Sequence, residues 1–74
     1  MWWHFVKLNE NDSSITYAFG YESRNTTGIF EYDKKKAIIT KDFDGDTTYY
    51  EFDLAILQLI EDYGAPDKKT IAYG

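Results

Sequence analysis

The chain has 74 residues, of which 43% are apolar and 19% aromatic, and its 13 acidic and eight basic side chains give a net charge of −5. A chain this short forms one small domain, residues 1–74, and buries only about 60% of the surface that its unfolded form exposes. These numbers exclude a two-domain enzyme, and the absence of cysteine excludes a disulfide-stabilised scaffold. The aromatic content excludes a disordered tail and favours β-rich packing, because aromatic rings fit the half-buried surface of a sheet.

The absence of cysteine also fits a reducing compartment. No apolar stretch approaches the roughly 18 residues that a membrane span needs. The first residues, Met1–Lys7, lack the basic leader, the long apolar run and the cleavage site of a secretory signal. We therefore expect a cytoplasmic protein whose partner is neither a membrane nor, given its negative charge, a nucleic acid.

Alternation with a period of two predicts strands at the start of the chain. In Ser14–Glu22 the larger apolar side chains share one face, and the polar cluster 9–13 separates this strand from another at Trp2–Leu8. The pattern leaves the facing of Trp2–Leu8 open. Trp3 and Phe5 share one face of it, and the other face carries Trp2, His4, Val6 and Leu8.

Two hairpins are predicted next. Ile29–Tyr32 and Ala37–Phe43 flank the loop Asp33–Lys36, and Asp44-Gly45 joins Ala37–Phe43 to Asp46–Phe52 as a two-residue turn. Both registers place the same apolar side chains on one face, and a slip of one residue would invert that face. The predicted cross-strand pairs are Tyr32 with Ala37, Phe30 with Ile39, Ile39 with Tyr50, and Ala37 with Phe52.

The period changes to that of a helix after Phe52. Asp53 is a favourable N-cap for a helix over Leu54–Tyr63, in which positions 56, 59, 60 and 63 form an apolar stripe. Gly64 and Pro66 end this helix. The weak alternation in Lys69–Tyr73 indicates a short last strand, and the pattern leaves open whether it joins the sheet.

The resulting order, β-β-β-β-α-β, predicts an α+β fold. It is a small antiparallel β-meander of four or five strands with one helix packed on one sheet face. The predicted core also includes one or two of the N-terminal aromatic residues. Its other members are Ile15, Tyr17, Phe19, Tyr21, Phe30, Tyr32, Ile39, Tyr50, Phe52, Ile56, Leu59 and Ile60.

Asp42, Asp44 and Asp46, with Asp53 further along, resemble the first, third, fifth and twelfth ligands of an EF-hand calcium loop. Thr47 stands where that loop needs glycine, and the residues before Asp42 predict a strand instead of a helix. We therefore interpret 42–46 as the tip of a hairpin. Weak calcium binding at this tip is an alternative function.

Side chains for catalysis are sparse. His4 is the only histidine, and without cysteine the usual zinc ligands are missing. No serine lies in a nucleophile motif, and no glycine-rich loop precedes the helix. We interpret Lys34–Lys36, the only basic cluster, as a charged hairpin loop. We expect no enzymatic activity and no cofactor.

The face turned away from the helix is more apolar than a solvated surface requires. It carries Ile29, Ile38 and Tyr49, and Leu57 lies off the main apolar stripe of the helix. These four residues predict an interaction surface for a protein partner or for a second copy of the chain. The sequence therefore favours a small, non-enzymatic interaction or adaptor module. An acidic inhibitor of a basic partner is a second alternative.

Overall fold

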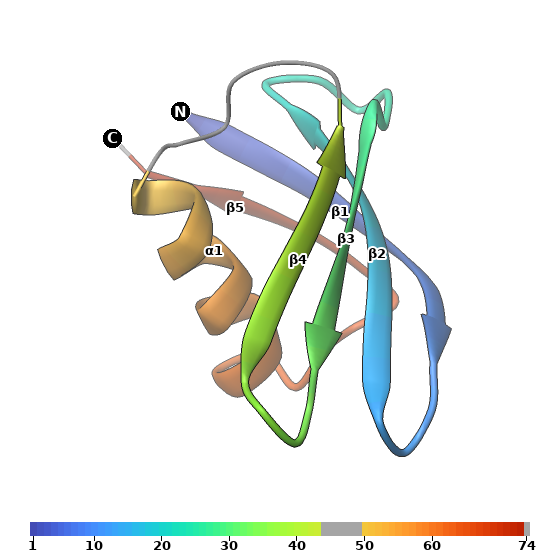
Figure 1. Cartoon of the computed structure of the whole chain (residues 1–74). Coiled ribbons are helices and arrows are strands. Elements are labelled where there is room, and N and C mark those ends of the chain that lie inside the picture. Colours follow the sequence, from blue (N-terminus) through green and yellow to red (C-terminus); the bar gives the residue numbers. More distant parts are fainter. Residues whose placement is uncertain (44–49, 74) are drawn as a thin grey trace.

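The computed structural model describes residues 1–43 and 50–73, and for residues 40–43 and 50 it describes the backbone alone. The described elements are β1 (Trp2–Glu10), β2 (Ser14–Tyr21), β3 (Gly28–Asp33), β4 (Ile38–Phe43), α1 (Tyr50–Glu61) and β5 (Lys68–Ala72). The strands form one antiparallel sheet in the order β4-β3-β2-β1-β5. The predicted α+β fold, an antiparallel sheet of four or five strands with one helix, is confirmed, and the sheet has five strands (Figure 1).

The path of α1 explains why one face of the sheet is covered. Because every neighbouring pair is antiparallel, β4 and β5 run in the same direction at opposite edges of the sheet. The chain must therefore cross the sheet between them, and α1 lies on the crossing (Figure 1). We call the face under α1 the inner face and the opposite one the open face.

The facing of β1, which the sequence left open, is decided by packing. Trp3 and Phe5 are fully buried on the inner face, whereas Trp2, His4 and Val6 are half-buried on the open face. The strand pairs with β2 along most of its length and has an irregular register between Lys7 and Asn9. This bulge leaves Leu8 exposed.

The hairpin of β3 and β4 keeps the predicted faces but not the predicted register. Tyr32 pairs with Ile39, not with Ala37, because the loop occupies residues 34–37. Ala37 closes this loop in a left-handed conformation, with φ of 55°, and its amide donates to the carbonyl of Asp33. The register moves by two residues, and an even shift leaves each side chain on its original face.

The helix begins earlier than predicted. It starts at Tyr50, so Asp53 lies in its first turn and is not the N-cap, and residues 50–52 are helix instead of strand. The predicted pairs of Tyr50 and Phe52 across a second hairpin are therefore wrong. The Asp44-Gly45 turn itself lies outside the described residues.

The stripe that α1 buries is shifted by about one turn from the predicted one. Phe52, Ala55, Ile56 and Leu59 are fully buried, at the spacing i, i+3, i+4, i+7. Tyr63, predicted to be part of the stripe, is 45% exposed. The chain leaves the helix through Gly64 and Ala65, at φ of 71° and 51°, and the amide of Ala65 donates to the carbonyl of Leu59. The helix ends at Glu61, two residues before the predicted end at Tyr63, and Gly64 has a positive φ in the turn that follows.

The core between the sheet and α1 is built from aromatic rings around Phe52. Its ring centroid lies 4.7 Å from that of Phe19, 5.6 Å from that of Trp3 and 6.3 Å from that of Phe30. Tyr21, which the sequence placed in the core, is 40% exposed at the end of β2. The buried residues that the prediction omitted include Ala18, Ala55, Ala65 and Ile71.

The last strand joins the sheet beside the first one. Trp3 pairs with Ile71. The N-terminal ammonium group of Met1 donates to the carbonyl of Tyr73 at 2.8 Å, and the amide of Tyr73 donates to the carbonyl of Met1 at 2.7 Å. The two ends of the chain therefore lie side by side (Figure 1). The turn before β5 is tied to the core by the Tyr17 hydroxyl, which donates to the carbonyl of Pro66.

Candidate functional site

The open face carries a continuous apolar row across three strands. Val6 in β1 pairs with Ala18 in β2, and Ala18 pairs with Ile29 in β3, so the three side chains are cross-strand neighbours. We call them the open-face row. Ala18 is only 8% exposed because it is flanked on both sides, whereas Ile29 remains 46% exposed.

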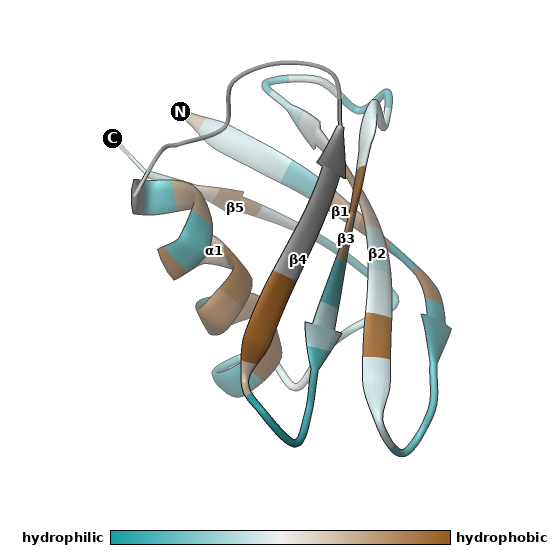
Figure 2. Ribbon diagram, in the orientation of Figure 1, coloured by the Kyte–Doolittle hydropathy of each residue, from teal (hydrophilic) through white to brown (hydrophobic). Residues whose placement is uncertain are grey.

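Ile38 lies on the same face, but at the far corner. It pairs with Asp33, four residues along β3 from Ile29, which corresponds to about 13 Å. The pair Glu31–Thr40 lies between them. Ile38 is 54% exposed, and the start of β4 is coloured as strongly hydrophobic in Figure 2. Two of the predicted surface residues, Ile29 and Ile38, are thus exposed on one face without touching.

The other two predicted surface residues do not extend this face. Tyr49 lies outside the described residues. Leu57 belongs to α1, on the opposite side of the sheet, and is partly buried against the core. The interaction surface predicted from the sequence is therefore divided, with Ile29 and Ile38 on the open face and Leu57 on the helix.

The end of the open face above β2 is covered by the chain's own backbone. A Cβ atom on Gly20 would lie 2.2 Å from the carbonyl oxygen of Asn25 and 2.6 Å from that of Ser23. The loop after β2 therefore crosses directly over Gly20, and a hydrogen bond of 3.0 Å from the Asn25 amide to the Ser23 hydroxyl holds its shape. Only glycine fits at this position, and the loop limits the open face at this end.

His4 has a structural partner on the open face. Its Nδ1 lies 3.1 Å from the hydroxyl oxygen of Thr70, the residue it pairs with in β5. The two side chains link β1 to the edge strand.

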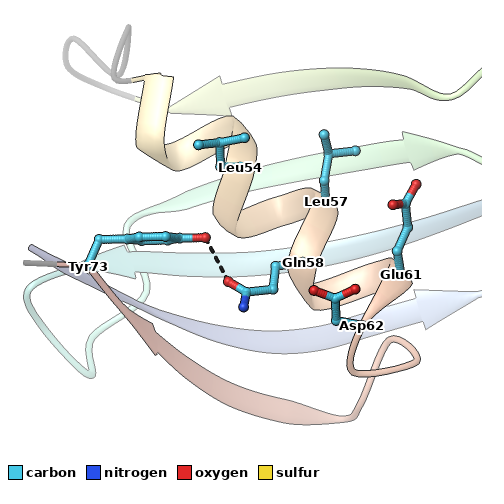
Figure 3. A pocket seen from close by; sticks show the side chains of 6 residues that line it. All are labelled: Leu54, Leu57, Gln58, Glu61, Asp62 and Tyr73. Atoms are coloured by element: carbon cyan, nitrogen blue, oxygen red, sulfur yellow. Dashed lines mark hydrogen bonds between the residues drawn. The ribbon is translucent and has the colours of Figure 1, made fainter.

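The outward side of α1 forms a shallow hollow beside the end of the chain. The hollow has a volume of about 340 Å³. Leu54, Leu57 and Gln58 line it together with Glu61, Asp62 and Tyr73 (Figure 3). The Tyr73 hydroxyl donates a hydrogen bond of 2.6 Å to Oε1 of Gln58 and fixes the ring beside the helix. Burial raises the pKa of Tyr73, with Tyr63 and Asp62 as weaker causes, so its hydroxyl stays protonated as a donor at neutral pH.

The sequence prediction found only part of this hollow. It noted that Leu54 and Leu57 fall off the main apolar stripe, but it did not connect them with Gln58, Glu61 and Asp62. The signal was present, because positions 54, 57, 58, 61 and 62 follow the helical spacing i, i+3, i+4, i+7, i+8. Tyr73 could not have been added, because only the pairing of β5 with β1 brings it to the helix.

The basic cluster after β3 is held within the hairpin loop. The carboxylate of Asp33 accepts hydrogen bonds from the amides of Lys35 and Lys36, at 2.9 and 3.0 Å, and these bonds lower its pKa. Lys34 forms a salt bridge of 3.0 Å with Glu10, which also contacts Lys7 at 2.6 Å. The hydrogen bonds from Lys7 and Lys34 lower the pKa of Glu10. As an anion, Glu10 links the hairpin of β1 and β2 to the loop of the hairpin of β3 and β4, through Lys34.

The aspartates of the alternative calcium tip fall largely on the segment between β4 and α1. Asp44 and Asp46 lie outside the described residues, and for Asp42 only the backbone position in β4 is described. Among the described residues, no three His, Asp or Glu side chains gather as a metal site would require.

Comparison of the chain with known proteins gives no match to a family model, to a curated protein or to a solved structure. Within the described residues, no helix has the length and apolar character needed to cross a membrane.

Proposed function

We propose that the protein is a non-enzymatic interaction module that pairs with a second copy of itself through the open face of its sheet. The observation that carries the proposal is the open-face row, Val6, Ala18 and Ile29, which is contiguous and ends in an isoleucine that is 46% exposed. An antiparallel sheet with one solvated face normally turns polar side chains outward. Three neighbouring apolar residues on that face are explained if another surface covers them.

The charges on this face favour a second copy. Its charged side chains, among those described in the strands, are Glu31, Lys68 and the half-buried Asp33, whose carboxylate already accepts hydrogen bonds from two backbone amides of the loop that follows. The two exposed ones, Glu31 and Lys68, have opposite signs. Lys68 stands next to Val6 in the register, at the β5 end of the row. Two copies related by a twofold axis can therefore meet without a net repulsion, and symmetric dimers are the commonest soluble assemblies.

A contact of standard size would use most of this face. The molecule measures 31 × 24 × 21 Å along its principal axes, and each partner contributes roughly 800 Å² to a standard interface. Two sheets packed face to face lie about 10 Å apart, with their side chains interdigitated.

The module would act in the cytoplasm, in keeping with a sequence that has no cysteine.

Sedimentation equilibrium on the wild type and on the double variant Ile29→Lys, Ile38→Lys tests the proposal. We expect the wild type to have the mass of a dimer at micromolar concentrations, and the variant to be a folded monomer with an unchanged circular dichroism spectrum. Leu54→Lys is the matched control, because Leu54 is an exposed apolar residue on α1, on the opposite side of the sheet from the open face. A wild type that stays monomeric at millimolar concentration would refute self-association.

A further inference from the structure

Helix α1 has a second stripe of side chains, outside the buried one. Leu54 is 37% exposed, Leu57 is partly buried, and Glu61 and Asp62 are exposed. Figure 3 shows these side chains projecting from successive turns of the helix. The stripe is apolar at its N-terminal end and acidic at its C-terminal end, and the ring of Tyr73 borders it on one side.

We propose that this stripe binds a basic amphipathic helix of a partner protein. The aliphatic side chains of such a helix would cover Leu54 and Leu57, and its lysine or arginine side chains would pair with Glu61 and Asp62. A helix that lays an apolar face along a shallow groove is a recurring mode of recognition. The 12 residues of α1 span about 18 Å, which matches three turns of a partner helix.

The distribution of charge along the chain supports a basic occupant. Residues 42–67 contain eight of the 13 acidic side chains and none of the eight lysines and arginines. Within this segment, the described part of α1 has acidic residues in its first turn and no basic residue in its last turn. Neither Glu61 nor Asp62 forms a salt bridge with another described residue, and both side chains are exposed.

The same charges argue against a second copy at this place. Two copies of α1 would bring acidic side chains together, and like charges on adjoining surfaces oppose association. The stripe therefore differs from the open face, where the exposed charges are of both signs. The two surfaces lie on opposite sides of the sheet, so this proposal does not depend on self-association through the open face.

Fluorescence anisotropy with a labelled model peptide tests the proposal. The probe is a helix of about eighteen residues with leucines on one face and lysines along its flanks, long enough to be helical when bound. We expect a dissociation constant in the micromolar range, about tenfold weaker binding to Leu54→Ser, and several-fold weaker binding to Glu61→Gln with Asp62→Asn. Weaker binding with rising salt concentration is also expected.

The controls separate recognition by the stripe from simple attraction between opposite charges. Asp12→Asn removes a charge from the exposed turn between β1 and β2 and should bind the peptide like the wild type. A peptide with the same composition in scrambled order, and one with glutamates in place of lysines, should not bind. The proposal is refuted if the scrambled peptide binds equally well, if Asp12→Asn weakens binding as much as the Glu61 and Asp62 changes do, or if no binding occurs at about 100 μM.

Discussion

Replacement of Phe52 tests both the position of the helix and the location of the core. The ring is fully buried and has the rings of Trp3, Phe19 and Phe30 among its neighbours, at centroid distances of 4.7 to 6.3 Å. Truncation to alanine leaves a cavity among groups that can collapse only partly, which costs about 3–5 kcal/mol. A domain of this length has a stability of roughly 4–11 kcal/mol at 0.05–0.15 kcal/mol per residue, so Phe52→Ala should be close to unfolding.

Tyr63→Ala is the matched comparison, because the sequence pattern placed Tyr63 in the buried stripe and left Phe52 in a strand. In the structure Tyr63 is 45% exposed, and its ring lies under the ammonium group of Lys69, 4.3 Å from the centroid. Loss of the Tyr63 ring should lower the free energy of unfolding by about 1 kcal/mol or less.

Urea denaturation followed by circular dichroism and tryptophan fluorescence measures both free energies of unfolding. Phe52→Leu, which leaves a smaller cavity, keeps the comparison measurable if Phe52→Ala does not fold. If Tyr63→Ala destabilised the protein as much as Phe52→Ala, the buried stripe assigned to α1 would be wrong.

Three further predictions concern a glycine, a tyrosine and a carboxylate. Gly20→Ala should lower the free energy of unfolding by about 1–3 kcal/mol in urea denaturation, because the new Cβ meets backbone oxygens that cannot rotate away. Gly64→Ala has free space around its Cβ and should lower it by about 1 kcal/mol, because of the positive φ. Equal losses for the two variants would contradict the crossing of the loop over β2. Burial raises the pKa of Tyr17 from 10.0 to about 12. The stabilising contribution of the protonated hydroxyl should therefore be fully present below pH 10 and be lost as the pH rises through 12. Urea denaturation at a series of pH values should show this loss in the wild type and a smaller one in Tyr17→Phe. The carboxyl group of Glu10 should titrate below its ordinary pKa of 4.5 by NMR, and Lys34→Met should move the pKa back toward that value; an unchanged pKa would contradict the salt bridge.

The candidate surfaces could be predicted only in part. Outward positions for Ile29 and Ile38 follow from alternation alone, and the two-residue shift in the register of β3 and β4 did not disturb them. The sequence pattern groups Leu57 with these residues, because it does not show on which side of the sheet the helix face that carries Leu57 lies. That helix face lies across the sheet from the open face, and its hollow is completed by Tyr73, which is distant in sequence.

The start of the helix shows why short apolar patterns are ambiguous. Tyr50 and Phe52 are two residues apart, as in a strand, but Phe52 also stands three and four residues before Ala55 and Ile56, as in a helix. The sequence contains both patterns. Burial of Phe52 among the core rings selects the helical one.

The sequence by itself determined the local features of this protein. These features are the strand periodicity of residues 2–43, the end of the helix before Gly64 and the crowding of acidic residues between 42 and 67. Each depends on neighbours a few positions apart. The tertiary structure alone decided which face of β1 is buried, where β5 joins the sheet and which side of α1 remains outward. Each of these depends on contacts between distant segments, and such contacts form only when α1 crosses the sheet and covers one of its faces.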